Sequence, residues 1–257
     1  MSIHPSAIVD EGAKLGSEIT VGPYSVIEAD TEIGNCCEIR SHATVKRYTF
    51  LGPSSVLYEG AVAGGEPQDV GFKGVRSYVR IGARNRIREG ATIHRGTMED
   101  SATEIGSDCY IMVCAHVAHN CHLGDGVILA NNVALAGHVD VGDGAFLSGG
   151  VVVHQFCQVG QLAMIGGNSK IVQDCLPFII TDGNPGRARG LNQVGLRRAG
   201  ISAKEIHNLK SAYRLLLRSG LKLETALDEM TGIESQFVDH LVGFVRGSKR
   251  GFCHSGD

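Results

Sequence analysis

The sequence predicts a mainly β protein, in which a parallel β-helix of hexapeptide repeats precedes a small α-helical domain. Three observations favour this fold. An aliphatic side chain recurs at every sixth position over most of the chain, and glycine provides 35 of the 257 residues, about twice its usual share. Aromatic residues make up only 5%, with no tryptophan, which fits a narrow core of stacked aliphatic side chains.

The six-residue period is the strongest of these signals. Every sixth residue from Ile3 onward is Ile, Leu or Val over residues 3–57, again in phase over 75–93, and again over 105–171. These three residue types form only 24% of the chain (62 of 257 residues), so chance does not explain such long runs.

The period also defines the repeating unit. An α-helix would repeat every 3.6 residues and a flat amphipathic strand every two. A six-residue unit fits a short strand and a turn, and three units form an 18-residue coil that stacks on the next coil at about 4.8 Å. Glycine often follows the aliphatic residue, and we expect it to supply the turn conformation at the corners. Since no unit buries its aliphatic side chain alone, stability comes from stacking.

The β-helix is expected to occupy residues 1–184, with two breaks in the period. Residues 63–75 are polar and glycine-rich and predict a loop extruded from one coil, in which Gln68 and Asp69 are candidate substrate-binding residues. Residues 95–103 form a second, more exposed break, for which a functional loop and a tolerated insertion are equally good interpretations.

Residues 185–257 predict the helical domain, which caps one open end of the stack. Ser202 and Glu205 form a predicted capping box at the start of the first helix, which ends at Gly220. A second helix is expected over residues 223–230 and a third around 237–245. The last eleven residues are expected to fray.

Charge and cysteine content narrow the compartment. The start of the chain carries no secretory signal, and no window has the roughly 18 apolar residues of a membrane span. Eight cysteines without a C-x-x-C motif favour reduced thiols and a cytoplasmic protein. A net charge of −3 argues against nucleic-acid binding.

Six of the eleven histidines lie between positions 94 and 154. On a helix, the spacing of His116, His119 and His122 would suggest a metal site. In a hexapeptide repeat, however, His116 and His122 fall on different faces of one coil, so no metal site is predicted. Adding 18 and 36 to position 119 gives 137 and 155, which predicts a column of stacked residues along one edge. That column and its neighbours are His116, His119, Gly137, His138, His154 and Gln155.

A histidine in such a column suits general-base catalysis near neutral pH. Gly137 above His119 leaves room for a substrate and offers a backbone N–H to a developing oxyanion. Because no serine or cysteine stacks on His119, direct transfer without a covalent intermediate is the simpler mechanism, and no cofactor is expected. Cys121 and Cys157 are interpreted as buried small hydrophobic residues.

Several segments resemble one enzyme family. They are residues 81–89, 92–97, 115–119, 129–132, 135–138, 153–156 and 195–198, which read IGARNRIRE, TIHRGT, AHVAH, LANN, LAGH, VHQF and GLRR. Together they resemble the acyl-ACP–UDP-N-acetylglucosamine O-acyltransferases, hexapeptide-repeat enzymes that begin lipid A synthesis. The resemblance covers nearly the whole chain and implies a left-handed β-helix and a homotrimer with active sites between neighbouring chains. It also implies transfer of an (R)-3-hydroxyacyl group from acyl carrier protein (ACP) to the 3-hydroxyl of UDP-N-acetylglucosamine.

The resemblance also assigns roles by motif position. His119 is then the catalytic base, the Gly137 N–H binds the thioester oxyanion, and His138 helps to hold the donor and the sugar. Gly167 lies where the family sets acyl-chain length, and the missing side chain favours a longer chain. The implied sugar-nucleotide contacts are Asp69, His116, His154 and Gln155, with Asn192 and Arg198 at the nucleotide and pyrophosphate end.

Four positions depart from the family pattern. Asn120 follows the catalytic histidine where the family often has aspartate, and Gly71 replaces a loop lysine. Val194 and Ala199 replace an acid and an arginine near the nucleotide end. An amide at position 120 accepts a hydrogen bond but does not stabilise an imidazolium by charge. The other differences bear on the sugar-nucleotide contacts rather than on the reaction type.

A cluster of arginines fits two interpretations, contact with acidic ACP or with phosphates, and simple solvation of the β-helix surface. The cluster comprises Arg76, Arg80, Arg84, Arg86 and Arg88.

Other functions remain open. A related N-acyltransferase acts on 3-O-acylated UDP-glucosamine and also has asparagine after its histidine, but it normally carries an N-terminal uridine-binding domain, for which hexads that begin at Ile3 leave no place. A UDP-sugar with a 3-amino group is another possible acceptor. A zinc hydratase resembling γ-type carbonic anhydrase needs three histidines that converge between subunits. The histidine column and loop 63–75 argue against a purely structural solenoid.

Overall fold

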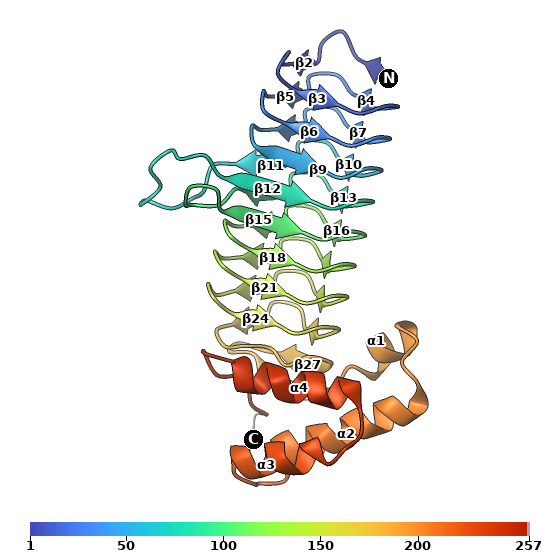
Figure 1. Ribbon diagram of the computed structural model, residues 1–257, viewed down its shortest axis with the longest axis vertical. Helices are drawn as coiled ribbons and strands as arrows, with labels where there is room; N and C mark the ends of the chain where they lie inside the picture. Colours follow the sequence, from blue (N-terminus) through green and yellow to red (C-terminus); the bar gives the residue numbers. More distant parts are fainter. Residues whose placement is uncertain (256–257) are drawn as a thin grey trace.

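The computed structural model describes residues 1–255 as a long β-helix with helices at its C-terminal end (Figure 1). Three sheets form the faces of the β-helix, and their strands are parallel except for the last pair. The predicted class, a parallel β-helix of hexapeptide repeats with a small helical region after it, is confirmed. No helix in the described part is both long and apolar enough to span a membrane.

Each coil contributes one short strand to each sheet in turn. Sheet A comprises β1 (Ser2–Ile3), β4 (Thr20–Val21), β7 (Glu38–Ile39), β10 (Val56–Leu57), β13 (Arg86–Ile87), β16 (Tyr110–Ile111), β19 (Ile128–Leu129), β22 (Phe146–Leu147), β25 (Met164–Ile165), β27 (Ile179–Asp182) and β28 (Arg187–Leu191). Sheet B comprises β2 (Ile8–Val9), β5 (Val26–Ile27), β8 (Thr44–Val45), β11 (Val62–Gly65), β14 (Thr92–His94), β17 (His116–Val117), β20 (Ala134–Leu135), β23 (Val152–Val153) and β26 (Lys170–Ile171). Sheet C comprises β3 (Lys14–Leu15), β6 (Glu32–Ile33), β9 (Thr49–Leu51), β12 (Tyr78–Ile81), β15 (Ala102–Ile105), β18 (His122–Leu123), β21 (Asp140–Val141) and β24 (Gln158–Val159). Strand β28 is antiparallel to β27 and extends sheet A beyond residue 184, where the sequence placed the end of the β-helix.

The register explains why the six-residue period survives its breaks. Most neighbouring coils pair at an offset of 18 residues, as Ile105 does with Leu123. The offset is 30 residues between Leu51 and Ile81 and 24 between Ile81 and Ile105. The additional twelve and six residues are whole multiples of the repeat, so the aliphatic positions return in phase.

Both insertions leave the β-helix at the corner between sheets B and C and project from the same edge (Figure 1). The first occupies residues 66–77, because residues 63–65 of the predicted loop belong to strand β11. The second occupies residues 95–101 and is less exposed than predicted, since Arg95 is only 4% exposed and Ser101 is half-buried.

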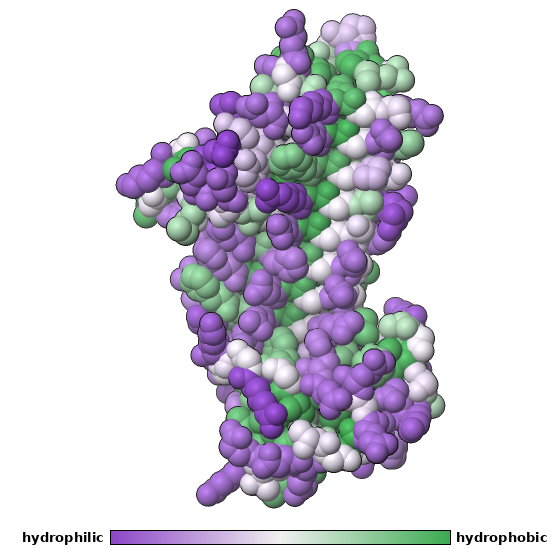
Figure 2. All heavy atoms as spheres, viewed as in Figure 1, coloured by the Kyte–Doolittle hydropathy of each residue, from purple (hydrophilic) through white to green (hydrophobic). Residues whose placement is uncertain are grey.

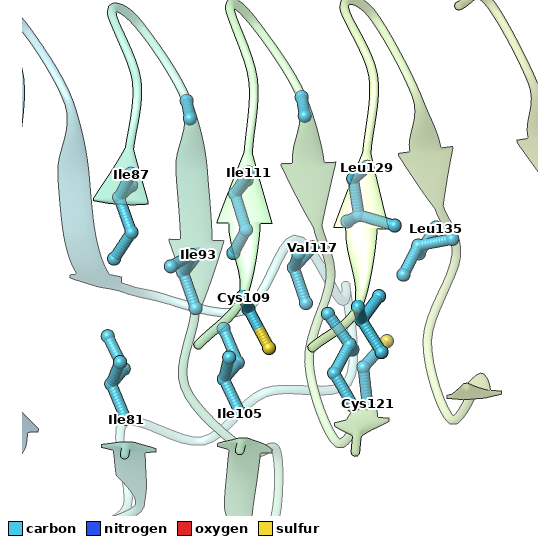
Figure 3. Close-up of a cluster of buried hydrophobic side chains, with 14 of the residues drawn as sticks. Ile81, Ile87, Ile93, Ile105, Cys109, Ile111, Val117, Cys121, Leu129 and Leu135 are labelled. Atoms are coloured by element: carbon cyan, nitrogen blue, oxygen red, sulfur yellow. The ribbon is translucent and has the colours of Figure 1, made fainter. Parts of the chain in front are cut away.

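The core is a stack of aliphatic side chains that point inward from all three sheets (Figure 3). Ile87, Ile111 and Leu129 from sheet A are fully buried, one above another. Cys121 fills space beside them and donates to the Ala136 carbonyl at 3.1 Å, and burial raises the pKa of its thiol to about 12. Cys121 and Cys157 are buried, as predicted.

The glycines after the aliphatic residues have a different role from the predicted one. The left-handed turn conformation falls two positions later, for example at Asn120 (φ 58°) and His138 (φ 60°). Gly52 instead lies against the next coil, where an added Cβ would be 2.8 Å from the Ala83 nitrogen. A glycine follows every strand of sheet C, and on this face Figure 2 shows a pale band along the β-helix between polar side chains. The missing side chains, rather than turn conformations, let successive coils approach closely.

Four helices follow the sheets: α1 (Gln193–Arg198), α2 (Ala203–Arg218), α3 (Leu223–Thr231) and α4 (Gln236–Gly247). Helix α1 was not predicted. Ser202 caps α2 and accepts from the Glu205 N–H at 3.2 Å, as expected for a capping box. The Glu205 carboxylate, however, accepts from the Ser235 hydroxyl at the start of α4, so it joins two helices instead of completing the box.

The predicted fraying of residues 247–257 is wrong for the part that the structure describes. Phe252 and Cys253 are 4% and 2% exposed, and residues 252 and 255 form β-bridges with Asp174 and Ala188. Ser248 donates to the Asp174 carboxylate at 2.6 Å. Residues 256 and 257 lie outside the described residues. The tail therefore seals the last coil of the β-helix.

We expect Gly52→Ala to lower the free energy of unfolding by about 2 kcal/mol, because its methyl group would force two coils apart. Urea unfolding followed by circular dichroism measures the loss. Gly243→Ala in α4, where an added Cβ meets nothing within 4 Å, is the matched control and should stabilise the protein slightly. Equal stability of Gly52→Ala and the wild type would contradict this account of coil packing.

Candidate active site

The predicted histidine column lies at the corner between sheets B and C. His119 and Asn120 occupy the turn between β17 and β18, Gly137 and His138 the turn between β20 and β21, and Gln155 the turn between β23 and β24. Both insertions leave the β-helix at the same corner. The 18-residue coil thus brings most of the predicted polar residues to one edge of the molecule.

His119 is held by a network that fixes the orientation of its ring. The Asn120 Oδ1 accepts from the Thr97 N–H at 3.1 Å and from the Thr97 hydroxyl at 3.0 Å. The same oxygen lies 3.1 Å from His119 Nδ1. Because a backbone N–H can only donate, it identifies this Asn120 atom as the oxygen, and His119 Nδ1 must therefore carry its proton. Nε2 is left with a lone pair, which is what a general base needs.

The second insertion supplies Thr97 for this network. Asn120 adopts a left-handed conformation (φ 58°), which asparagine tolerates well, and its N–H donates to the Thr103 hydroxyl at 2.8 Å. The network therefore joins the catalytic turn to residues 97 and 103 of the preceding coil. These contacts favour the functional interpretation of the break at residues 95–103.

Gly137 lies directly against the His119 ring. An added Cβ at residue 137 would be 2.6 Å from His119 Nε2, so only glycine fits. At the equivalent turn positions Ser17, Ser107 and Asp125, the backbone N–H donates to a side chain of the next coil. The Gly137 N–H has no acceptor among residues 1–255. An N–H without an acceptor beside the base can bind an oxyanion.

The neighbouring histidines are neutral at physiological pH. His138 lies edge-on to His119, with ring centroids 5.3 Å apart, and stacks on Phe156 at 4.7 Å. Burial, and then the proximity of His119, lower the pKa of His138. The His116 Nδ1 lies 2.8 Å from the Thr92 hydroxyl, and the same two causes lower the pKa of His116. Both side chains can thus hydrogen-bond to a substrate without adding charge.

His94 was not predicted as a site residue. It lies edge-on to His116 with ring centroids 4.9 Å apart, and its buried Nδ1 has no partner among the described residues. Burial, followed by the proximity of His116 and His119, lowers the pKa of His94 to about 4. Adding 18 to position 94 misses these histidines, whereas the actual offset of 24 reaches residue 118. The inserted residues concealed this neighbour.

The long loop brings Asp69 to the catalytic histidine. The Asp69 Oδ2 lies 4.0 Å from His119 Nε2, while its Oδ1 accepts from the Gly71 N–H at 2.7 Å. Gln68 is exposed on the same loop. His154 and Gln155 are exposed on the coil two beyond His119, and no contact joins them to His119. All of these residues belong to the B–C corner.

The remaining predicted residues lie elsewhere on the chain. Asn192 caps α1 by accepting from the Gly195 N–H at 3.0 Å and donates to the Leu162 carbonyl at 2.9 Å. With Arg198 it lines a hollow of about 590 Å³ over sheet A, whose wall includes Val194 and Ala199. Gly167 lies at the corner between sheets A and B. Sheet A is the face opposite the B–C corner, so one chain does not bring these residues to His119.

The arginine cluster is largely paired within the chain. Four of its members lie 2.6–3.8 Å from a carboxylate, as Arg76–Asp100, Arg80–Glu104, Arg84–Asp108 and Arg88–Glu89. Arg86 donates to the Tyr58 hydroxyl at 3.1 Å. This pairing favours the solvated-surface interpretation of the cluster.

Stacked hexapeptide coils with a base held against a bare glycine define a hexapeptide-repeat acyltransferase. Residues 102–137 match the family model of the bacterial transferase hexapeptide (six repeats), and residues 174–253 match that of UDP N-acetylglucosamine O-acyltransferase, domain 2. The chain is 42% identical over 254 residues, 98% of each protein, to the acyl-[acyl-carrier-protein]–UDP-N-acetylglucosamine O-acyltransferase of Thermodesulfovibrio yellowstonii. The protein belongs to this family of acyltransferases.

Solved structures agree with this assignment. The UDP-N-acetylglucosamine acyltransferase from Bacteroides fragilis is 36% identical with a TM-score of 0.96, and the match covers 98% of this chain and 100% of that one. The UDP-N-acetylglucosamine O-acyltransferase from Moraxella catarrhalis is 41% identical with a TM-score of 0.96, and the match covers 99% and 100% of the two chains. The fold and the family are therefore established together.

We expect Asn120→Asp to move the acidic limb of the pH profile of kcat/KM for acyl transfer to higher pH by roughly 1 unit, because a carboxylate beside Nδ1 favours the imidazolium. The measurement is the initial rate between pH 5 and 9. Asn132→Asp, at the same left-handed turn position on another corner (φ 59°), is the matched control and should leave the profile unchanged. An unshifted limb in Asn120→Asp would show that position 120 does not act on the base.

Proposed function

We propose that the protein transfers an (R)-3-hydroxyacyl group from ACP to the 3-hydroxyl of UDP-N-acetylglucosamine, the first step of lipid A biosynthesis. The observation that carries the proposal is the contact between His119 and Gly137, which places an unprotonated Nε2 beside an N–H without an acceptor. The names of the relatives supply the donor and the acceptor.

The reaction follows from these two groups. His119 Nε2 takes the proton of the sugar 3-hydroxyl as the oxygen attacks the thioester carbonyl. The Gly137 N–H donates to the oxyanion of the tetrahedral intermediate, which carries the developing negative charge. The C–S bond then breaks, and the His119 imidazolium returns its proton to the leaving thiolate. The products are the 3-O-acyl sugar nucleotide and ACP with a free thiol.

The side chains around the base orient the substrates. We assign His138 to the donor and the sugar, and His116, His154, Gln155 and the loop residues Gln68 and Asp69 to the sugar nucleotide. The lowered pKa values of His116 and His138 support uncharged hydrogen-bonding roles for these two. Gly167 is assigned to the end of the acyl groove, where the missing side chain favours a long acyl chain.

A homotrimer with shared active sites follows from the placement of these groups. Asn192 and Arg198 lie over sheet A, on the face opposite the B–C corner that carries His119. One protomer can place sheet A against the histidine corner of the next, so that each site draws on two chains. Eight free cysteines fit the reducing cytoplasm, to which we assign the protein.

Incubation with UDP-N-acetylglucosamine and (R)-3-hydroxyacyl-ACPs of several chain lengths tests the activity. We expect a 3-O-acyl product from the wild type and a loss of at least about 100-fold in kcat for His119→Ala, because a general base is removed. His122→Ala, an exposed histidine of the same coil, is the control and should retain activity. Product only with a 3-amino acceptor would assign that substrate instead, and stoichiometric catalytic zinc would favour the hydratase.

Mixed trimers test the shared site. His119→Ala and Arg198→Ala chains should each be inactive alone. Refolded together in equal amounts, they should recover about a quarter of wild-type activity, because each mixed trimer of cyclic symmetry contains one intact site in three. No recovery from trimers that form normally by light scattering would place both residues in a site within one chain.

A further inference from the structure

The charge of the molecule is strongly uneven. The whole chain carries 24 Lys and Arg against 27 Asp and Glu. The segment 187–222, which includes β28, α1 and α2, carries nine basic residues and one acidic residue, Glu205. The nine are Arg187, Arg189, Arg197, Arg198, Lys204, Lys210, Arg214, Arg218 and Lys222.

These basic side chains differ from the arginine cluster of the β-helix in having no acidic partners. Four of the five β-helix arginines form ion pairs along the stack. In contrast, none of the nine lies within 4 Å of a carboxylate in the part of the chain that the structure describes. Glu205 itself is engaged by the Ser235 hydroxyl. The segment therefore presents uncompensated positive charge.

Part of this charge lines a groove. Lys210, Arg214 and Arg218 are four residues apart on successive turns of α2, so they share one exposed face. They line a groove of about 560 Å³ between α2 and β28, whose floor includes Tyr213 and Leu215. We name these three residues the α2 basic face.

The groove continues into the proposed active site. Leu191 and Gln193 line both this groove and the hollow over sheet A that holds Asn192 and Arg198. His119 lies three coils before the last coil of the β-helix, about 14 Å along the axis by strand spacing. A flexible thioester arm that starts at the α2 basic face thus has a continuous path toward the site.

We propose that the α2 basic face docks the acidic surface of the acyl carrier protein and so delivers the acyl donor. The proposal rests on the proposed function, and it moves the ACP contact from the arginine cluster of the β-helix to the C-terminal helices. Charge complementarity is the reason, because an unpaired basic face attracts an acidic partner and accelerates its association. The groove beside it leaves the arm free to enter the cleft.

Charge reversal tests the docking surface. Lys210→Glu/Arg214→Glu should raise the KM for (R)-3-hydroxyacyl-ACP by about tenfold or more at low salt, with kcat within about twofold of the wild type. The salt dependence of the KM should weaken as well. Fluorescence anisotropy of labelled holo-ACP, measured without chemistry, should show the same loss of affinity.

A carrier-free donor separates this proposal from the proposed function. The (R)-3-hydroxyacyl thioester of pantetheine lacks the acidic protein, so the double variant should use it as well as the wild type does. Lys14→Glu/Arg246→Glu changes the net charge equally at two sites away from the α2 basic face, and it is the matched control. An unchanged KM and affinity for ACP in the α2 variant would overturn the docking surface. An equal rise in KM with the carrier-free donor would overturn it too, while a wild type inactive with every donor would overturn the function.

Discussion

The close stacking of one coil on the next is the constraint on which the rest of the molecule depends. Backbone hydrogen bonds join parallel strands at every level, and side chains are absent wherever two corners meet, as at Gly52. Because the stack admits no partial repeats, the two insertions have twelve and six extra residues and leave at a corner. The solenoid thereby keeps its aliphatic core continuous while it changes its surface at one edge.

The candidate site is a direct product of this stacking. Residues at the same turn position of successive coils lie one strand spacing apart, so the glycine at position 137 lies against the ring of His119. The two ends of that ring have different surroundings. Nδ1 faces Asn120 and, through it, Thr97 of the shorter insertion, whereas Nε2 faces the open side and Asp69 of the longer one. A rigid scaffold fixes the base, and two loops complete its environment.

Sequence reasoning found what the period determines and missed what depends on side-chain contacts. The hexads predicted the coils, and multiples of 18 placed Gly137 on His119. The same arithmetic failed for His94, because the inserted residues make its coil 24 residues long. The bond between Thr97 and Asn120 joins positions 23 residues apart through loop geometry that no local pattern encodes. The tail looked frayed by composition, yet Phe252 is buried by a last coil that lacks any further coil to cover it.

A stack of coils also limits what a single chain can assemble. The three faces of a triangular β-helix point away from one another, and no motion of a rigid solenoid can turn sheet A toward the opposite corner. The B–C corner has a base and an N–H donor, whereas sheet A has an apolar hollow with Asn192 and Arg198 at its rim. Neither surface alone both binds a large substrate and activates it. A protein that needs both on this fold must bring them together by association, which makes assembly a part of the chemistry rather than an addition to it.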